Sequence, residues 1–346
     1  MPDTQILVQD GSCSRAAGEP PQGTPVGCAG NCWQAPALSR DGGLTWNGAG
    51  ETWTAPGELR LLARVGRIDP VALPASGYPA LDKARSLGPD AVWQVVKDSG
   101  LRGRGGAYFP VGLKWETARN APSDRKYLLI NAEEGEPGIY KDRHLMEGDP
   151  HRLLEGIQIA ALAVAASSAV LFINGEAKLS QQRMLAALER ARAANLVPVP
   201  VEVRFGGGGY VLGEESAMIN SIHGYRCEPL PRPPLPVISG LHARPTVINN
   251  AESIANLPDI VLHGVDWFRS TGSADTPGTK LVSLAGDVRR PGLYEVPVGT
   301  PVGEIFETWG GGASGTLEAF LAGGPSGSIL PASLVDTPLD VRPMQE

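Results

Sequence analysis

Three short apolar segments, separated by two longer helical ones, constrain the fold of this chain more than any other feature. KYLLINA (126–132), AVLFING (169–175) and VPVEVRFG (199–206) each predict a buried strand, because they are short, apolar and bounded by polar turns. The apolar segment that opens at Pro150 and the amphipathic LSQQRMLAALERARAAN (179–195) predict the helices between them. This alternation indicates a wound sheet, so we predict an α/β domain.

The bulk properties exclude several classes of protein. The most apolar stretch, residues 157–173, is shorter than the ~20 residues that a membrane-spanning helix needs, so we predict no membrane span. The formal net charge of −7, from 30 basic and 37 acidic residues, gives no electrostatic reason to bind nucleic acid. The first residues lack the basic and apolar regions of a secretory signal, and we expect a cytoplasmic protein.

The rest of the chain differs from this middle part in composition and in the pattern of apolar residues. Residues 1–56 are rich in Gly, Pro, Ser and Thr and show little periodic pattern. DAVWQVVKDSG predicts a helix that stops at Gly100, as at a helix C-cap. The Pro-rich residues 227–245 predict a rigid extended strap. From about Thr279 to Leu330, short strands and a small helix predict a separate β-grasp module.

Two glycine-rich loops are the first candidates for a binding site. GLRGRGGAYFPVGLKW (100–115) carries Gly103, Gly105 and Gly106 among basic side chains, and such a loop lets backbone N–H groups approach a phosphate. Its spacing matches neither the Walker motif nor a G-x-G-x-x-G after a strand, so alone it is more simply a tight surface turn. The second loop, Gly206–Gly209, also allows a plain strand–helix turn. Two such loops in one α/β domain favour a nucleotide cofactor.

Acidic side chains lie beside the first predicted strand and beside the second glycine loop. Glu133, Glu134 and Glu136 follow the strand, and Glu214 and Glu215 follow the glycines. Carboxylates are poor phosphate ligands, but they accept hydrogen bonds from ribose hydroxyls and carboxamide N–H groups. The alternative is a solvated acidic loop.

A few single residues complete the set of candidates. Asn249–Asn250, after the apolar PTVI, allow either a plain turn or amide contacts to a flavin or nucleotide. We expect His144 and His151, beside a predicted helix start, to be capping or surface groups. Trp115 and Trp309 are expected in the core.

Four segments in order carry a resemblance to a known family: GLRGRGGAYFPVGLKW, INAEEGEPGIYKDRHLMEGDPHRLLEGI, GYVLGEESAMINSIHG and RPTVINNAESIANLP. Together they resemble the flavin-bearing, NADH-oxidising (F-type) component of bacterial respiratory complex I. The same motifs occur in the homologous diaphorase subunits of NAD-linked hydrogenases and formate dehydrogenases. The resemblance covers roughly Pro70 to Leu330, and four motifs in sequence are far more specific than any one of them.

The resemblance implies a Rossmann-like domain that binds FMN, with NADH as the substrate that stacks its nicotinamide on the flavin. The positions that match FMN contacts are Gly103, Arg104, Gly105, Lys114, Asn131, Glu133, Glu134, Gly213, Glu214, Glu215, Asn249 and Asn250. The positions that match NADH contacts are Phe109, Glu136, Tyr210 and Glu215. The implied chemistry is hydride transfer to the flavin, for which the protein supplies stacking, orientation and electrostatics, with Glu215 as an orienting group and no catalytic base.

Several positions differ from the family pattern, among them Arg232 for a Lys and Leu230 for an Arg. Tyr108 stands where the family has a glycine, and a bulky residue there crowds the loop or demands another backbone shape. Glu133 stands where Asp is typical. Leu235 replaces a Phe that flanks the adenine, which would weaken stacking by ~1 kcal/mol. These changes leave FMN binding plausible and put the affinity for NADH in question.

The iron–sulfur centres implied by the resemblance lack their ligands in this sequence. The family continues past the β-grasp module into a helical domain with S-C-x-x-C-x-x-C and a fourth Cys that hold a [4Fe–4S] cluster, whereas no C-x-x-C occurs here. Cys13, Cys28 and Cys32 resemble part of the thioredoxin-like [2Fe–2S] domain of the hydrogenase and formate dehydrogenase relatives, which needs four Cys. We therefore expect a vestigial segment without a cluster, unless another ligand completes the site. Either the subunit is truncated or split, or electrons leave the flavin by another route.

These observations divide the chain into five parts: a vestigial thioredoxin-like segment (1–56), an FMN- and NADH-binding α/β domain (70–245), a connector (246–278), an SLBB-like β-grasp module (279–330) and a tail (331–346). The function expected from the resemblance is an FMN-dependent NADH dehydrogenase module. It would pass electrons to other subunits of an NADH dehydrogenase, hydrogenase or formate dehydrogenase assembly, which can be peripheral to the inner membrane. The alternative is a non-catalytic paralogue that scaffolds partner subunits, which Tyr108 and Leu235 favour.

Overall fold

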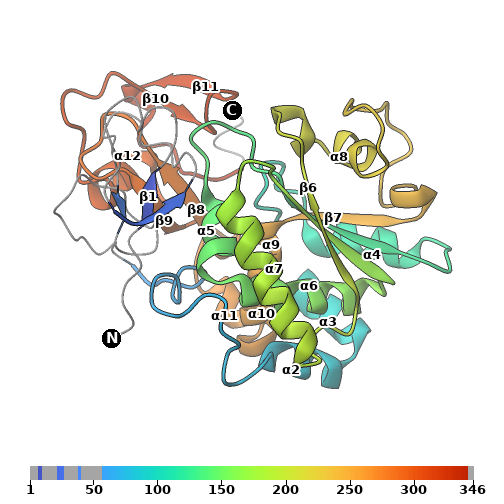
Figure 1. Cartoon of the computed structure of the whole chain (residues 1–346). Helices are drawn as coiled ribbons and strands as arrows, with labels where there is room; N and C mark the ends of the chain where they lie inside the picture. The colour runs from blue at the N-terminus through green and yellow to red at the C-terminus, as the bar shows by residue number, and fades with distance from the viewer. Residues whose placement is uncertain (1–6, 10–21, 27–37, 40–56, 342–346) are drawn as a thin grey trace.

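A four-stranded parallel sheet organises the larger domain in the computed structural model, which describes residues 7–9, 22–26, 38–39 and 57–341 (Figure 1). Its strands are β4 (Tyr127–Ala132), β5 (Ser168–Ile173), β6 (Val201–Phe205) and β7 (Thr246–Asn250). They lie in the order β6-β5-β4-β7, and all three neighbouring pairs are parallel. The predicted α/β class is confirmed.

Side chains alternate between the two faces of this sheet, as the period of two along a strand requires. Leu128 belongs to the larger core cluster on one face, whereas Leu129 packs with Phe172 on the other. Helix α6 (Pro150–Val164) lies on the first face and α8 (Glu215–Ile222) on the second (Figure 1). Because both faces are covered, β4 and β5 are apolar and buried almost throughout, which explains their short continuous apolar runs in the sequence, whereas the edge strand β6 alternates apolar and charged residues.

Helices and short turns make up the rest of this domain. The other helices are α2 (Pro79–Leu87), α3 (Pro89–Ser99), α4 (Val111–Asn120), α5 (Lys141–Gly148), α7 (Lys178–Ala193), α9 (Ala251–Ala255), α10 (Leu257–His263) and α11 (Val265–Arg269). The 3-10 helices are η2 (Tyr210–Gly213) and η3 (Leu241–Ala243). Helix α3 stops where predicted, because Gly100 adopts the left-handed φ of 71° that ends a helix. Within the described residues, no helix combines the length and apolar character needed to cross a membrane.

Residues 246–278, expected as a connector, belong instead to the α/β domain. β7 lies within them and pairs along its length with β4. Helices α9 and α10 follow, and their Ile254, Leu257 and Ile260 are fully buried in the larger core cluster. The sequence pattern of β7 is weak, because the strand follows a Pro-rich segment and only Val247 and Ile248 in it are aliphatic.

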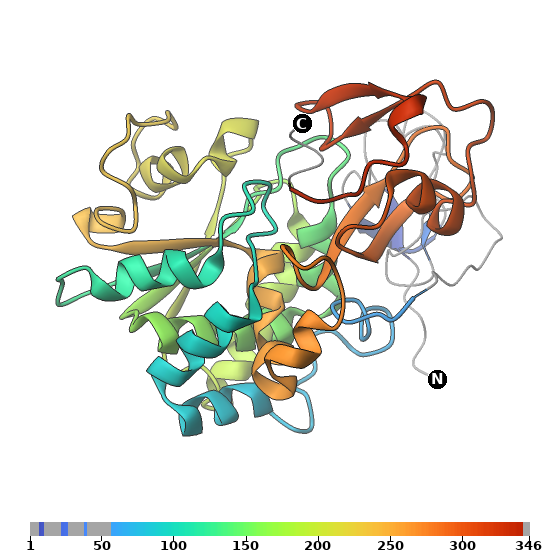
Figure 2. The ribbon, with the colours of Figure 1, turned by 180° about the vertical axis from the view of Figure 1, so that it is seen from behind.

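The C-terminal module consists of two antiparallel hairpins with short helical turns between and after them. β8 (Thr279–Leu284) pairs with β9 (Gly292–Pro297), and β10 (Ala319–Ala322) pairs with β11 (Ser328–Pro331). Helix α12 (Val302–Glu304) and the π-helical turn η4 (Ile305–Trp309) lie between the hairpins, and η5 (Ala332–Leu334) follows. Tyr294, Ile305 and Trp309 are in its own small core. Figures 1 and 2 show this module beside the α/β domain.

The described part of the N-terminal region is a small three-stranded sheet. It contains β1 (Leu7–Gln9), β2 (Thr24–Val26) and β3 (Leu38–Ser39), with β1 in the middle. Cys13, Cys28 and Cys32 lie outside the described residues. The vestigial iron–sulfur segment therefore stays a prediction.

The two histidines beside α6 differ from the expectation of capping or surface groups. His144 and His151 are only 4% and 2% exposed. His151 Nδ1 lies 2.9 Å from the hydroxyl of Tyr78, and His144 Nδ1 donates to the carbonyl of Tyr140 at 2.7 Å. The segment that bears Tyr78 lies far from His151 in the sequence and covers it only in the folded chain. Trp115 and Trp309 are buried, as predicted.

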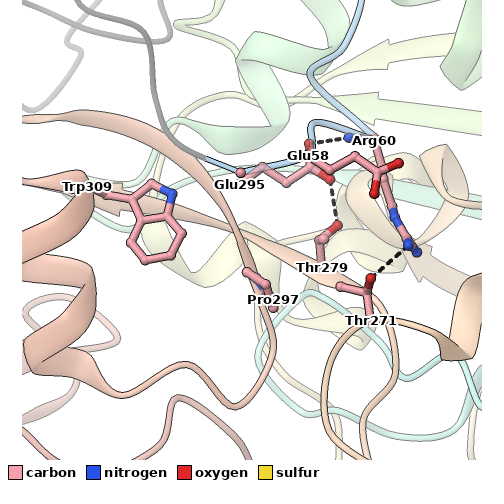
Figure 3. A pocket seen from close by; sticks show the side chains of 8 residues that line it. Glu58, Arg60, Thr271, Thr279, Glu295, Pro297 and Trp309 are labelled. Atoms are coloured by element: carbon pink, nitrogen blue, oxygen red, sulfur yellow. Dashed lines mark hydrogen bonds between the residues drawn. The ribbon is translucent and has the colours of Figure 1, made fainter.

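Glu295 on β9 fastens the C-terminal module to the segment that precedes α2. Its carboxylate accepts hydrogen bonds from the backbone N–H groups of residues 60–62, each at 3.0 Å, and from the Thr279 hydroxyl at 2.6 Å (Figure 3). The Arg60 guanidinium in turn lies 4.1 Å from the ring of Trp267 in α11. Residues 60–62 are thus held between the two domains.

We predict that Glu295→Ala destabilises the chain by about 3 kcal/mol, because it leaves three buried N–H groups without an acceptor. Urea unfolding followed by far-UV circular dichroism measures the difference. Glu318→Ala is the matched control, since Glu318 is an exposed carboxylate of the same module. Equal stabilities of the two variants would contradict this role of Glu295.

Candidate functional site

The candidate site lies at the carboxyl edge of the sheet, where the strand order reverses. From β4 the chain passes to β5 and β6 on one side, and then crosses back from β6 to β7 on the other side of β4. In open parallel sheets, ligands bind beyond the carboxyl ends of the strands at such a point. Asn131 at the end of β4 is paired in register with Asn250 at the end of β7. The fold therefore brings two separate sequence motifs to the expected crevice.

The first glycine loop and the turn that follows the second one meet these two asparagines. The Asn131 amide donates to the carbonyl of Gly213 at 2.9 Å, at the end of η2. The first loop lies over Asn250, because a Cβ at Gly105 would come within 3.0 Å of the Asn250 Cβ. Asn250 also caps α9, since its side chain accepts a hydrogen bond from the backbone of Glu252. Four motifs that are well separated in the sequence thus share one edge of the sheet.

Lys114 connects the helix after the first loop with the helix after the second. Its Nζ lies 2.9 Å from Glu215 Oε1 and 3.0 Å from the carbonyl of Ile248. The Lys114 and Glu215 side chains are 22% and 28% exposed, so a ligand can still reach them. Arg232 from the Pro-rich segment pairs with Glu214 and lies 3.6 Å from Glu215. This is an open cluster of two cations and two carboxylates.

Glu214 is the N-cap of α8. Its carboxylate accepts from the backbone N–H groups of Ser216 at 2.8 Å and Ala217 at 2.9 Å. Burial pushes the pKa of Glu214 upward, but the hydrogen bonds from Ser216, Ala217 and Arg232 outweigh it and hold the pKa below its ordinary value. Glu214 is therefore ionised near neutral pH.

Glu133 presents an unsatisfied oxygen just beyond the carboxyl end of β4. One of its carboxylate oxygens accepts from the Asn174 amide at 2.6 Å, whereas Oε2 is buried and has no hydrogen-bond partner. A side chain at Gly206 would collide with that oxygen, so the glycine at the end of β6 keeps the space open. Burial raises the pKa of Glu133 from 4.5 to about 7. A buried orphan acceptor indicates a ligand that supplies the missing donor.

Two predicted contacts are occupied by the protein itself. The Glu134 carboxylate accepts from the backbone N–H groups of Asp142 at 3.0 Å and Arg143 at 3.3 Å, at the start of α5. The Asn249 side chain accepts from the indole N–H of Trp115 at 2.8 Å. Through these hydrogen bonds, both residues fix the position of the segments that carry the site.

Arg104 differs from the expectation that its charge faces a phosphate. Its side chain is 0% exposed, and the guanidinium donates to the backbone carbonyls of Pro277 at 2.6 Å and Thr279 at 3.0 Å. Gly103 closes the loop by donating its N–H to the carbonyl of Phe109 at 3.0 Å. The arginine side chain is therefore directed into the protein, and the backbone N–H groups of Gly103 and Arg104 are bonded within it.

Two of the residues predicted for NADH are exposed aromatic residues, and a third contacts the C-terminal module. Phe109 is 52% exposed and Tyr210 is 59% exposed, so both rings are free to stack on a planar ligand. The Glu136 carboxylate accepts from Ser326 N at 2.8 Å and from its hydroxyl at 2.9 Å, in the turn between β10 and β11. Burial alone would raise the pKa of Glu136, but hydrogen bonds from Ser326 and Tyr210 lower it.

Tyr108 adopts the left-handed backbone conformation that favours glycine, with φ of 52°. Its ring lies 4.9 Å from the Nζ of Lys280 at the start of the C-terminal module. Tyr108 therefore holds a backbone conformation that glycine adopts most easily, and its ring packs against Lys280 of β8.

Two residues of the site were not predicted from the sequence. Asn174 holds Glu133, and its position after the strand β5 is a signal that could have revealed it, because polar residues at the carboxyl ends of neighbouring parallel strands meet. Ser326 gives no such signal, since it approaches Glu136 only through the docking of the two domains. The cavity of about 250 Å³ in Figure 3 lies elsewhere, among Arg60, Glu295 and Trp309.

The fold and the site define an FMN-binding α/β domain joined to an SLBB domain. The family model of the Nuo51 FMN-binding domain matches residues 96–259, and that of the SLBB domain matches residues 281–330. The chain belongs to the family of the F-type, FMN-binding subunits of NADH-quinone oxidoreductase and the related hydrogenase subunits.

Relatives from several bacteria support this membership. The second F-type component of NADH-quinone oxidoreductase from Rhizobium meliloti is 42% identical over 76% of this chain and 66% of its own length. The NADP-reducing hydrogenase subunit HndC of Solidesulfovibrio fructosivorans is 39% identical over 84% of this chain and 62% of its own length. A crystal structure of an NAD+-reducing [NiFe]-hydrogenase in the H2-reduced state matches 98% of this chain and 66% of the other, with a TM-score of 0.78 and 32% identity. The chain spans less than two thirds of the length of these curated relatives.

We predict that Glu133→Gln changes how stability depends on pH. Because the pKa of Glu133 is raised to about 7, the folded chain holds a proton that the unfolded chain releases near pH 4.5. The free energy of unfolding of the wild type should therefore fall as the pH rises from 4.5 to about 7, by roughly 1–3 kcal/mol more than that of the variant.

Urea unfolding at pH 5 and pH 8 measures this difference. Glu189→Gln, at an exposed position of α7, should preserve the wild-type pH dependence. If Glu133→Gln also follows the wild type, the buried orphan carboxyl does not exist in solution.

Proposed function

We propose that this chain is an FMN-dependent NADH dehydrogenase module, in which NADH delivers a hydride to a bound flavin. The observation that carries the proposal is the convergence of both glycine loops, the paired asparagines and the orphan Glu133 oxygen at the point where the strand order reverses. The names of the relatives add weight, because they include NADH-quinone oxidoreductase and NADP-reducing hydrogenase subunits.

FMN fits the residues present at this edge of the sheet. Bound FMN supplies the chemistry, because its ring accepts a hydride and can release electrons one at a time. The protein would hold it with the backbone of Gly103 and Gly105, the charge of Lys114, and the polar groups of Asn131, Glu133, Gly213, Glu214, Glu215 and Asn250. Asn249, Glu134 and Arg104 would support these FMN-contacting residues from the protein side.

The nucleotide would bind at the open side of the crevice. Phe109 and Tyr210 present exposed rings for stacking, and Glu136 and Glu215 are acceptors for hydroxyl or amide donors. The carboxylates also disfavour an additional phosphate, because like charges repel. No acid–base pair is needed for a hydride transfer.

The partners in this proposal are other subunits of an NADH dehydrogenase, hydrogenase or formate dehydrogenase assembly, which would receive the electrons. We further propose that residues 1–56 are a vestigial thioredoxin-like segment and that the SLBB-like module includes residues 279–330. A cytoplasmic assembly, attached to the inner membrane through other subunits, fits this role.

A non-catalytic scaffold is the second candidate, and the exposed Leu235 favours it. Leu235 is 49% exposed and provides no aromatic face at the place where the family has a phenylalanine. The visible spectrum of the purified protein, recorded anaerobically before and after NADH is added, separates the two functions. A flavin band that bleaches with NADH supports the dehydrogenase, whereas a protein that FMN cannot reconstitute is a scaffold.

We predict that Lys114→Ala weakens FMN binding roughly tenfold or more, because a charge-assisted hydrogen bond to the phosphate is lost. Quenching of flavin fluorescence on titration of the apoprotein measures the affinity. Lys178→Ala, at an exposed position at the start of α7, is the matched control. An unchanged flavin affinity of Lys114→Ala would reject the phosphate assignment.

Leu235→Phe should improve NADH binding if the adenine stacks beside the Pro-rich segment. An added aromatic contact of ~1 kcal/mol corresponds to roughly a fivefold lower KM for NADH, with kcat unchanged. Steady-state assays with ferricyanide as the acceptor give both constants. Leu230→Phe, an exposed position of the same segment, tests whether any added aromatic ring has this effect.

A further inference from the structure

The first glycine loop contacts residues 275–280, the segment that leads into the SLBB module. We call this segment the hinge. Arg102 Nε donates to the carbonyl of Asp275 at 2.8 Å. Arg104 reaches the carbonyls of Pro277 and Thr279, and the Tyr108 ring lies 4.9 Å from Lys280 Nζ. Three residues of one loop thus contact one segment, residues 275–280, which is distant in the sequence.

Arg104 is the most constrained of these contacts. Its side chain is fully buried, and its three guanidinium nitrogens donate to the backbone carbonyls of Thr279, Pro277 and Arg102. Burial lowers the pKa of Arg104. A buried cation that is stabilised by carbonyl groups is costly to leave without them. Any movement of the hinge therefore requires the loop to move as well.

The backbone of Arg104 belongs to the candidate flavin site. Its N–H donates to the Ser253 hydroxyl at 2.8 Å, in α9. The next residue, Gly105, lies against Asn250, and the preceding one, Gly103, closes the loop through Phe109. The same residue therefore has its backbone at the crevice and its side chain in the hinge.

The SLBB module also touches the other side of the crevice. Thr279 is the first residue of β8, so the hinge continues directly into the module. The turn between β10 and β11 reaches back to the site, where Ser326 holds Glu136. The module thus contacts the α/β domain at the glycine loop and at the open side of the crevice.

We propose that Arg104 is a positioning residue that couples flavin binding at the glycine loop to the seating of the SLBB module. It sets the shape of the loop from beneath and does not touch the flavin. Because such coupling is reciprocal, FMN should tighten the hinge by the same factor by which a seated hinge tightens FMN. This inference rests on the proposed flavin site.

The first measurement is the FMN affinity of the full-length chain, by fluorescence quenching, for Arg104→Met and Arg104→Lys. We expect Arg104→Met to raise the Kd for FMN roughly tenfold, within the range typical of coupled sites, and Arg104→Lys to have a smaller effect because it keeps the charge. Arg85→Met is the matched control, because Arg85 forms an exposed ion pair with Asp82 on α2. A folded Arg104→Met variant with wild-type affinity would overturn the proposal.

The second measurement is hydrogen exchange of the hinge, in peptides that cover residues 275–284. In the wild type, saturating FMN should slow exchange of these amides severalfold. In Arg104→Met, saturating FMN should leave their exchange unchanged. A purely structural arginine predicts faster exchange with or without FMN and no loss of the FMN response, so that outcome also rejects the coupling.

Lys280→Ala keeps the test decisive if Arg104→Met does not fold. It removes only the contact with the Tyr108 ring, and we expect about a twofold to threefold weaker FMN affinity together with a reduced FMN response of the hinge. An unchanged response in Lys280→Ala would count against the coupling. Lys114→Ala separates this inference from the proposed function: if it loses FMN while the arginine variants do not, the site stands and the coupling fails.

Discussion

The parallel pairing of β4 with β7 is the contact on which the rest of the site depends. It sets Asn131 opposite Asn250 and places the two glycine loops on either side of them. Because parallel strands end at the same edge, polar residues that follow each strand gather there without any further device. A one-residue slip of β7 would turn Asn250 to the other face of the sheet and would remove the cap of α9.

Most polar groups below this edge are satisfied by the protein itself. Lys141 lies between Asp142 and Glu252 at 2.8 and 3.0 Å, and Glu134 caps α5. Against this background, the unpartnered oxygen of Glu133 is distinctive. A network of hydrogen-bonded polar groups with one unpartnered acceptor is the arrangement expected of a preorganised cofactor site.

The SLBB module is part of this arrangement as well as a neighbour of it. Glu295 ties it to residues 60–62, Arg104 reaches its hinge, and Ser326 holds Glu136. These three contacts bind the module at separate points. The position of the module and the shape of the crevice are therefore mechanically connected.

The sequence by itself determined the α/β class and the helix that ends at Gly100, whereas the candidate site residues were predicted from the family resemblance. The class and the helix end are local features. These features depend on local patterns of apolar residues and on glycine conformation, which act over a few residues. The sequence did not predict that β7 completes the sheet, because β7 follows a Pro-rich segment and only two of its residues, Val247 and Ile248, are aliphatic. Only the tertiary structure decided the roles of Arg104, Glu134 and Ser326, because their partners are brought close by chain packing. From the sequence, an arginine in a glycine loop can bind either a phosphate or buried backbone carbonyl groups. The burial of the Arg104 side chain in the structure distinguishes these two roles.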